Sequence, residues 1–135
     1  MKTDPMIVYV EDDPLSRQVM ELLLVRKMRL NNVAIFEDST NIIQRMEGLN
    51  RKPDVFLLDI HMAPHDGFEV NALLRAHPTF ANSAIIALTA SVMNEDIHRL
   101  EQAGFDGVIA KPIDQMSFPD LLSRVLNGEK IWTVT

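Results

Sequence analysis

The stretch Met6-Ile7-Val8-Tyr9-Val10-Glu11-Asp12-Asp13-Pro14 joins an apolar run to an acidic cluster and a helix start. The run over residues 6–10 is rich in β-favouring residues and predicts a buried strand. Asp13 can accept a hydrogen bond at a helix N-cap, and Pro14 suits the first helical position. The stretch therefore predicts a strand with an acidic carboxyl end, followed directly by a helix.

The same strand–helix alternation repeats four more times along the chain. The further strands are predicted over residues 33–36, 55–58, 84–88 and 108–110. Apolar residues at helical spacing predict a helix after each strand, and the last four helices are closed by Gly48, Pro78, Gly104 and Gly128. In the first helix, the apolar residues that fall on one face at helical spacing are Leu15, Val19, Leu22 and Leu23.

The predicted strands are nearly continuous apolar runs, which is typical of parallel strands covered by helices on both faces. Five strand–helix units are too few for an eight-stranded barrel. The pattern therefore predicts an α/β fold with an open, doubly wound, five-stranded parallel sheet and five helices. In such sheets the functional crevice lies outside the carboxyl ends of the strands.

The carboxyl ends of four predicted strands carry carboxylate, hydroxyl or ammonium side chains, namely Glu11/Asp12/Asp13, Asp59, Thr89 and Lys111. Two carboxylates about 4 Å apart at an effective dielectric near 20 repel by roughly 4 kcal/mol, so one is protonated or a cation lies among them. Mg2+ prefers such oxygen ligands. One carboxylate would remain free as a nucleophile toward phosphorus, with Lys111 and the Thr89 hydroxyl stabilising the transferred group.

Composition narrows the class of protein further. The net charge of -6 and the lack of a dense basic run argue against direct nucleic-acid binding. The chain has no cysteine, which excludes disulfides and thiol catalysis and suits a cytoplasmic location. Residues 1–10 do not form a signal peptide, and the longest near-apolar stretch, residues 84–93, is too short to span a membrane.

An ordered set of motifs over residues 6–127 resembles the receiver domains of two-component response regulators. The motifs are Val10-Glu11-Asp12-Asp13-Pro14, Phe56-Leu57-Leu58-Asp59-Ile60-His61-Met62, Asp66-Gly67, Ala87-Leu88-Thr89-Ala90, Ala103-Gly104-Phe105-Asp106-Gly107 and Lys111-Pro112-Ile113. Each motif alone is weak, but their order is highly specific. The resemblance implies a flavodoxin-like sheet with strand order 2-1-3-4-5.

The resemblance also implies a role for each matching position. Asp59 would be the phosphoacceptor, Thr89 would hydrogen-bond the phosphoryl group, and Lys111 would pair with its oxygens. The implied Mg2+ ligands are Glu11 (through water), Asp12, Asp59 and the backbone carbonyl of His61. The chain would assist its own phosphorylation and dephosphorylation and would not otherwise be an enzyme.

The implied partners are proteins. A sensor histidine kinase or a histidine phosphotransfer protein would donate the phosphoryl group. A downstream protein would contact the face formed by helix 4, strand 5 and helix 5. We expect no direct nucleic-acid contact, no membrane span, and a monomer or a phosphorylation-dependent dimer.

Three departures from the family pattern stand out. Ala63 occupies the usual proline position, and Pro64 follows it. Val108 occupies the position of the family's switch aromatic, so the switch is weaker or another residue carries it. His61 and Ser91 fall where the family tunes phosphoryl lifetime by flanking the path of the attacking water, although His61 fits a solvated loop residue equally well.

The sequence predicts a receiver domain over residues 1–128 and a tail over residues 129–135. Only seven residues follow Gly128, which favours a stand-alone regulator without an output domain. The alternative is a receiver segment of a hybrid histidine kinase or larger regulator. Trp132 in the tail suggests docking on the domain or on a partner, whereas most terminal residues are loose.

Two other function classes compete with a receiver. A small Mg2+-dependent phosphatase with an aspartyl nucleophile would want a second carboxylate at position 61, where this chain has His61. Turnover of phosphomonoesters would distinguish such an enzyme. A flavodoxin-like cofactor binder would want a Ser/Thr/Gly loop after the first strand, where Glu11, Asp12 and Asp13 would instead repel a phosphate.

Overall fold

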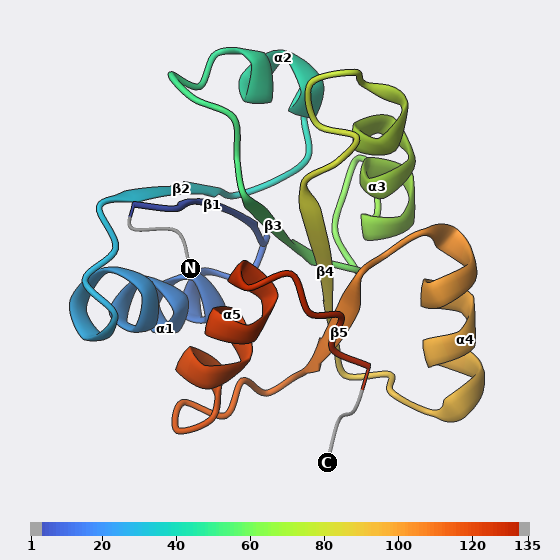
Figure 1. Cartoon of the computed structure of the whole chain (residues 1–135). Helices are drawn as coiled ribbons and strands as arrows, with labels where there is room; N and C mark the ends of the chain where they lie inside the picture. Colours follow the sequence, from blue (N-terminus) through green and yellow to red (C-terminus); the bar gives the residue numbers. More distant parts are fainter. Residues whose placement is uncertain (1–3, 133–135) are drawn as a thin grey trace.

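The computed structural model describes residues 4–132 and contains one parallel sheet (Figure 1). The strands lie in the order β2-β1-β3-β4-β5. They are β1 (Met6–Val10), β2 (Asn32–Phe36), β3 (Val55–Asp59), β4 (Ala84–Thr89) and β5 (Gly107–Ala110). The predicted fold and strand order are both confirmed.

Helices follow all five strands. They are α1 (Pro14–Glu21), which continues into a π-helical segment η1 (Leu22–Lys27), α2 (Ile42–Glu47), α3 (Gly67–Ala76), α4 (Asn94–Ala103) and α5 (Phe118–Leu126). The predicted N-cap is present, because the Asp13 carboxylate accepts hydrogen bonds from the backbone N–H and the hydroxyl of Ser16. Within residues 4–132, no helix has the length and apolar character needed to cross a membrane.

The predicted apolar face of the first helix is wrong at two of its four positions. Leu15 and Leu22 are 67% and 54% exposed, while Leu23 is buried as expected. The buried face of this helix is instead formed by Met20, Leu23 and Leu24. These three residues are also spaced three and four apart, so helical periodicity alone does not distinguish this face from the neighbouring one that contains Leu15 and Leu22.

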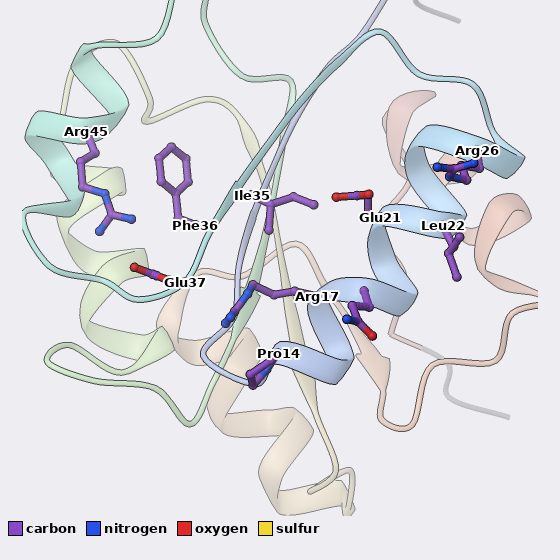
Figure 2. A pocket seen from close by; sticks show the side chains of 10 residues that line it. Pro14, Arg17, Glu21, Leu22, Arg26, Ile35, Phe36, Glu37 and Arg45 are labelled. Atoms are coloured by element: carbon purple, nitrogen blue, oxygen red, sulfur yellow. The ribbon is translucent and has the colours of Figure 1, made fainter.

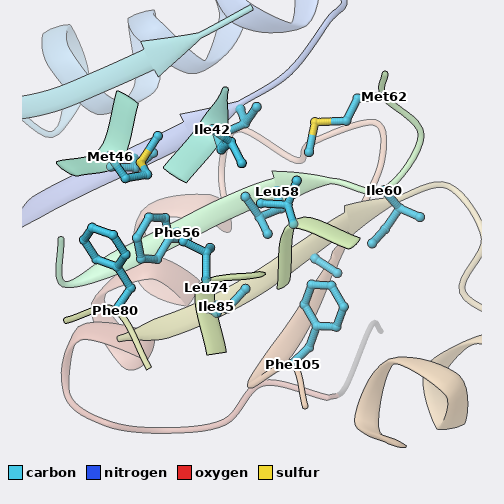
Figure 3. Close-up of a cluster of buried hydrophobic side chains, with 14 of the residues drawn as sticks. Ile42, Met46, Phe56, Leu58, Ile60, Met62, Leu74, Phe80, Ile85 and Phe105 are labelled. Atoms are coloured by element: carbon cyan, nitrogen blue, oxygen red, sulfur yellow. The ribbon is translucent and has the colours of Figure 1, made fainter. Parts of the chain in front are cut away.

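The sheet separates two apolar clusters. One cluster packs beneath α2, α3 and α4 and includes Phe56 and Leu58; the other packs beneath α1 and α5 and includes Leu57. Figure 3 shows the first cluster, where Phe56 meets Phe80 edge-on with 5.9 Å between ring centroids. Successive residues of β3 therefore serve opposite faces, as covered parallel strands require.

Candidate functional site

The strand register brings the predicted site residues to one edge of the sheet. Val10 pairs with Leu58 across β1 and β3, so Glu11 and Asp59 are the next residues of the two strands. Thr89 pairs with Ala110 across β4 and β5, so Lys111 follows beside it. The Lys111 N–H also donates to the Thr89 carbonyl at 2.9 Å. Residues widely separated in the sequence thus meet at the carboxyl ends of β1, β3, β4 and β5.

The ammonium group of Lys111 bridges two buried carboxylates. Its Nζ lies 2.9 Å from Oε1 of Glu11 and 3.3 Å from Oδ1 of Asp59. Glu11 and Asp59 are 1% and 3% exposed. Such charge-assisted contacts fix the positions of all three groups. One ammonium facing two carboxylates still leaves the pocket with an excess of negative charge.

Asp12 completes an acidic group with these two carboxylates. One carboxylate oxygen from each of Glu11, Asp12 and Asp59 lies within 4.8 Å of the others. Asp12 is exposed, whereas the other two are buried, so the group opens to solvent on one side. Three clustered carboxylates match the hard oxygen ligands that Mg2+ prefers, so this donor set fits the ion implied by the sequence.

Two further residues that the sequence analysis missed hold Glu11 in place. The hydroxyl of Tyr9 donates to Oε1 of Glu11 at 3.0 Å, and Nη1 of Arg17 donates to the Glu11 carbonyl at 2.8 Å. Tyr9 precedes Glu11 by two residues, and alternate strand residues point to the same side of a sheet. That spacing is the signal that could have identified Tyr9.

Burial and charge move the pKa values in this pocket in different directions. Burial, together with the neighbouring Glu11, raises the pKa of Asp59 to about 6. Burial would also raise the pKa of Glu11, but the hydrogen bond from Lys111 outweighs it and holds that pKa below its ordinary value. Burial opposes charge on Lys111, but contact with Glu11 and Asp59 raises its pKa. Asp59 is therefore the carboxylate that is easier to protonate.

Thr89 lies beside a small hollow next to the acidic group. Its side chain is 3% exposed, and its Oγ1 accepts a hydrogen bond from the backbone N–H of Ser91 at 3.1 Å. His61, Thr89 and Ser91 are among the residues lining this hollow of about 190 Å³. The role of the His61 carbonyl as a metal ligand stays a prediction. His61 itself is exposed and lines the hollow.

The loop after β3 is held closely although Ala63 replaces the expected proline. The Ser39 hydroxyl donates to the His65 carbonyl at 2.7 Å and accepts from the His65 N–H at 2.8 Å. At the loop's end, the Gly67 N–H donates to the Ile60 carbonyl at 2.9 Å. A Cβ atom on Gly67 would lie 2.9 Å from the Asp59 carbonyl oxygen, so only glycine permits this close return of the chain.

A larger groove, about 800 Å³ in volume, lies between α1, β2 and α2 (Figure 2). None of the residues predicted for the site lines it. Two of its arginines already donate to backbone carbonyls, Arg17 to Glu11 and Arg45 to Asp38 and Thr40. The side chains predicted for the site therefore lie at the acidic edge of the sheet and not in this groove.

Comparison with known proteins places this geometry in context. A family model described as "Response regulator receiver domain" matches residues 7–123. A curated relative, the "Nitrate/nitrite response regulator protein homolog" of Haemophilus influenzae, is 30% identical over 125 residues, which are 93% of this chain. The chain spans 58% of the length of that relative.

Solved structures share the fold. A chemotaxis response regulator of Vibrio cholerae superposes with a TM-score of 0.81 at 21% identity, covering 91% of this chain and 99% of the other. The receiver domain of a sensor histidine kinase from Pseudomonas aeruginosa PAO1 gives a TM-score of 0.79 at 26% identity, covering 93% and 99%. That receiver domain has a magnesium ion coordinated in its active site cleft.

Proposed function

The chain belongs to the family of response regulator receiver domains of two-component systems, and from this premise we propose that Asp59 accepts a phosphoryl group from a phosphohistidine. The donor would be a sensor histidine kinase or a histidine phosphotransfer protein. The observation that carries the proposal is the pocket in which buried Asp59 lies 3.3 Å from Lys111 and within 4.8 Å of Glu11 and Asp12.

In the proposed reaction, a carboxylate oxygen of Asp59 attacks the phosphorus atom. The new O–P bond forms as the N–P bond to the donor histidine breaks, leaving an aspartyl phosphate and a neutral donor imidazole after proton balance with solvent. Asp59 must be ionised to attack, and a pKa of about 6 leaves most of it ionised at pH 7. The ammonium of Lys111 is close enough to offset charge that gathers on the phosphoryl oxygens.

Glu11, Asp12, Asp59 and the carbonyl of His61 would hold Mg2+ in this proposal. When bound, the ion would offset the negative charge of both the carboxylates and the phosphoryl oxygens. Glu11 is positioned for this by Lys111 and Tyr9, while exposed Asp12 can turn toward an incoming ion. The similar receiver domain of a sensor histidine kinase, which has coordinated magnesium, supports the assignment.

Thr89 and strand β5 would transmit the phosphorylated state. The hydroxyl of Thr89 can donate to a phosphoryl oxygen while its oxygen keeps the hydrogen bond from Ser91. Phosphorylation would then shift a pre-existing two-state equilibrium toward the form bound by a downstream protein. We propose the α4–β5–α5 face for that contact, with the protein a monomer or a phosphorylation-dependent dimer.

The chain could serve alone or within a larger protein. Its similarity to a response regulator homologue of greater length and to the receiver domain of a sensor kinase supports the second arrangement. In either setting the proposed chemistry at Asp59 is the same.

The test is labelling by a small acyl phosphate such as acetyl phosphate, followed by intact-mass measurement with and without Mg2+. Wild type should gain one phosphoryl group with Mg2+, and Asp59→Asn should gain none. Asp13→Asn is the matched control, because Asp13 is exposed and asparagine preserves its N-cap role. Equal labelling of wild type and Asp59→Asn would reject the proposal.

A further inference from the structure

After α5 the chain returns to the open edge of the sheet. Gly128 has φ +90°, a left-handed conformation that glycine adopts readily, and reverses the chain. Ile131 then bridges to Gly107 in parallel orientation. Its N–H donates to the Asp106 carbonyl at 3.2 Å, and its carbonyl accepts from the Val108 N–H at 2.9 Å. Figure 1 shows this segment running alongside β5.

The fit between Ile131 and Gly107 is close. Ile131 is 2% exposed and belongs to the cluster beneath α1 and α5. A Cβ atom on Gly107 would lie 2.5 Å from Cγ1 of Ile131 and 2.7 Å from its carbonyl oxygen. The absence of a side chain at Gly107 therefore creates the space in which the Ile131 backbone and side chain lie.

The next residue reaches the opposite face of the sheet. Trp132 packs, half-buried, against the cluster beneath α2, α3 and α4, which contains Val108. The short segment thus covers the β5 backbone with Ile131 on one side and an aromatic ring on the other. The sequence left open whether Trp132 docks on the domain or on a partner, and the structure shows that it docks on the domain.

We propose that the outer edge of β5 is a binding site for an extended segment that carries a β-branched residue followed by an aromatic residue, and that residues 129–132 are a built-in competitor for it. The chemistry of the occupant follows from the segment already seated there. Within residues 4–132, the tail is held to β5 by one bridged pair. An external segment making a longer ladder would replace it, as in recognition by strand addition.

This site lies on the α4–β5–α5 face, so only its use as an output surface rests on the proposed function. The binding itself needs no phosphoryl group. A failure to label Asp59 would therefore refute the proposed function and leave the β5 edge to be judged by its own experiments.

The first experiment uses a substitution that should displace the tail from the outer edge of β5. Trp132 is the only tryptophan, so its fluorescence reports on the tail alone. In Gly107→Ala we expect red-shifted emission and at least tenfold faster amide exchange at Val108. Gly48→Ala is the matched control, because the nearest atom to its added Cβ is 3.5 Å away. Wild-type emission and exchange in a folded Gly107→Ala protein would overturn the proposal.

The second experiment measures binding directly. The double variant Ile131→Asp/Trp132→Ala opens its tail, keeps Gly107 and has no tryptophan, so a synthetic peptide of residues 128–135 becomes the only source of tryptophan fluorescence. We expect saturable binding with a blue shift. Adding Gly107→Ala should weaken it at least tenfold. Absence of binding, or equal affinity with and without Gly107→Ala, would contradict the proposed site.

Wild-type protein completes the test of competition. With peptide labelled by an extrinsic fluorophore, wild type should bind at least tenfold more weakly than the double variant, because its own tail occupies the edge. Sedimentation of both proteins separates this from tail exchange between copies. A wild-type dimer that becomes monomeric in the double variant would show exchange and overturn the intramolecular competitor.

Discussion

Lys111 Nζ lies 3.3 Å from Oδ1 of Asp59, although 52 positions separate the two residues in the chain. The same ammonium is shared with Glu11 at 2.9 Å. One positive charge neutralises only part of the negative charge of two buried carboxylates. The pocket is therefore suited to receive further positive charge.

Asp59 should make the protein less stable as pH rises. Its folded pKa of about 6 exceeds the unfolded value of about 3.9, so the folded state binds the proton more tightly. The contribution of Asp59 to the free energy of unfolding should fall between about pH 4 and pH 6 and stay lower above, by up to roughly 3 kcal/mol. Without divalent ions, Asp59→Asn should be more stable than wild type at pH 7.5, by a margin that shrinks toward pH 4.

Urea unfolding at the two pH values measures this difference. Asp13→Asn serves as the control, because it changes an exposed carboxylate outside the acidic group. An Asp59→Asn protein that is less stable than wild type at pH 7.5 would contradict the predicted sign.

Mg2+ should stabilise the fold through Asp12. An ion that binds only the folded state adds about 1.4 kcal/mol at ten times its Kd. We expect thermal unfolding of wild type to shift upward with Mg2+ and the shift to be much smaller in Asp12→Asn, because that variant removes one of the three clustered carboxylates. Glu37→Gln, an exposed carboxylate at the end of β2, should keep the full shift. Equal shifts of thermal unfolding in all three proteins would show that Asp12 does not contribute to ion binding.

Lys111→Met should destabilise the protein at pH 7.5 without Mg2+. The change leaves Glu11 and Asp59 buried without their shared cation. The expected loss is on the order of 2 kcal/mol, less than for a fully buried pair because the Lys111 side chain is 23% exposed. Lowering the pH to 5 should recover part of the loss by protonating a carboxylate. Lys27→Met, which removes an exposed ammonium, is the comparison, and a pH-independent loss would argue against this charge balance.

Asp66→Ala should loosen the start of α3. The Asp66 carboxylate accepts from the Glu69 N–H at 2.9 Å, and the Glu69 carboxylate accepts from the Asp66 N–H at 3.0 Å. Losing this capping box should lower the free energy of unfolding by about 1 kcal/mol. Asp66→Asn should restore most of it, because an amide oxygen can also cap. Urea midpoints of the three proteins decide between capping and a loss of charge alone.

Local sequence patterns predicted most of the fold. The apolar runs located all five strands to within one residue at either end, as for residues 33–36 against Asn32–Phe36. Asp13 and Gly104 marked a helix start and a helix end that the structure shows. The strand order came from the family resemblance, since periodicity does not encode which strands are neighbours.

The remaining features depend on contacts that no local pattern encodes. Leu15 and Leu22 are exposed because apolar residues at helical spacing also occur on a second face of the helix, which is the one that is buried. The hydroxyl of Tyr9 in β1 meets Glu11 just after the strand, and only the two-residue spacing between them hints at this contact, because a tyrosine in an apolar run otherwise resembles a core residue. Ile131 pairs with Gly107 across 24 positions, and only the space above the glycine explains it.

The alternation of β3 side chains has one more consequence. Phe56 and Leu58 pack in one cluster and Leu57 in the other, and Asp59 is the next residue in this alternation. Inserting or deleting a single residue within Val55–Leu58 would move apolar side chains of β3 to the opposite face of the sheet. It would also turn Asp59 away from Glu11 and Lys111. A change in strand register that displaces the Asp59 carboxylate should therefore also disrupt the core, so chains that lose the position of Asp59 should fail to fold.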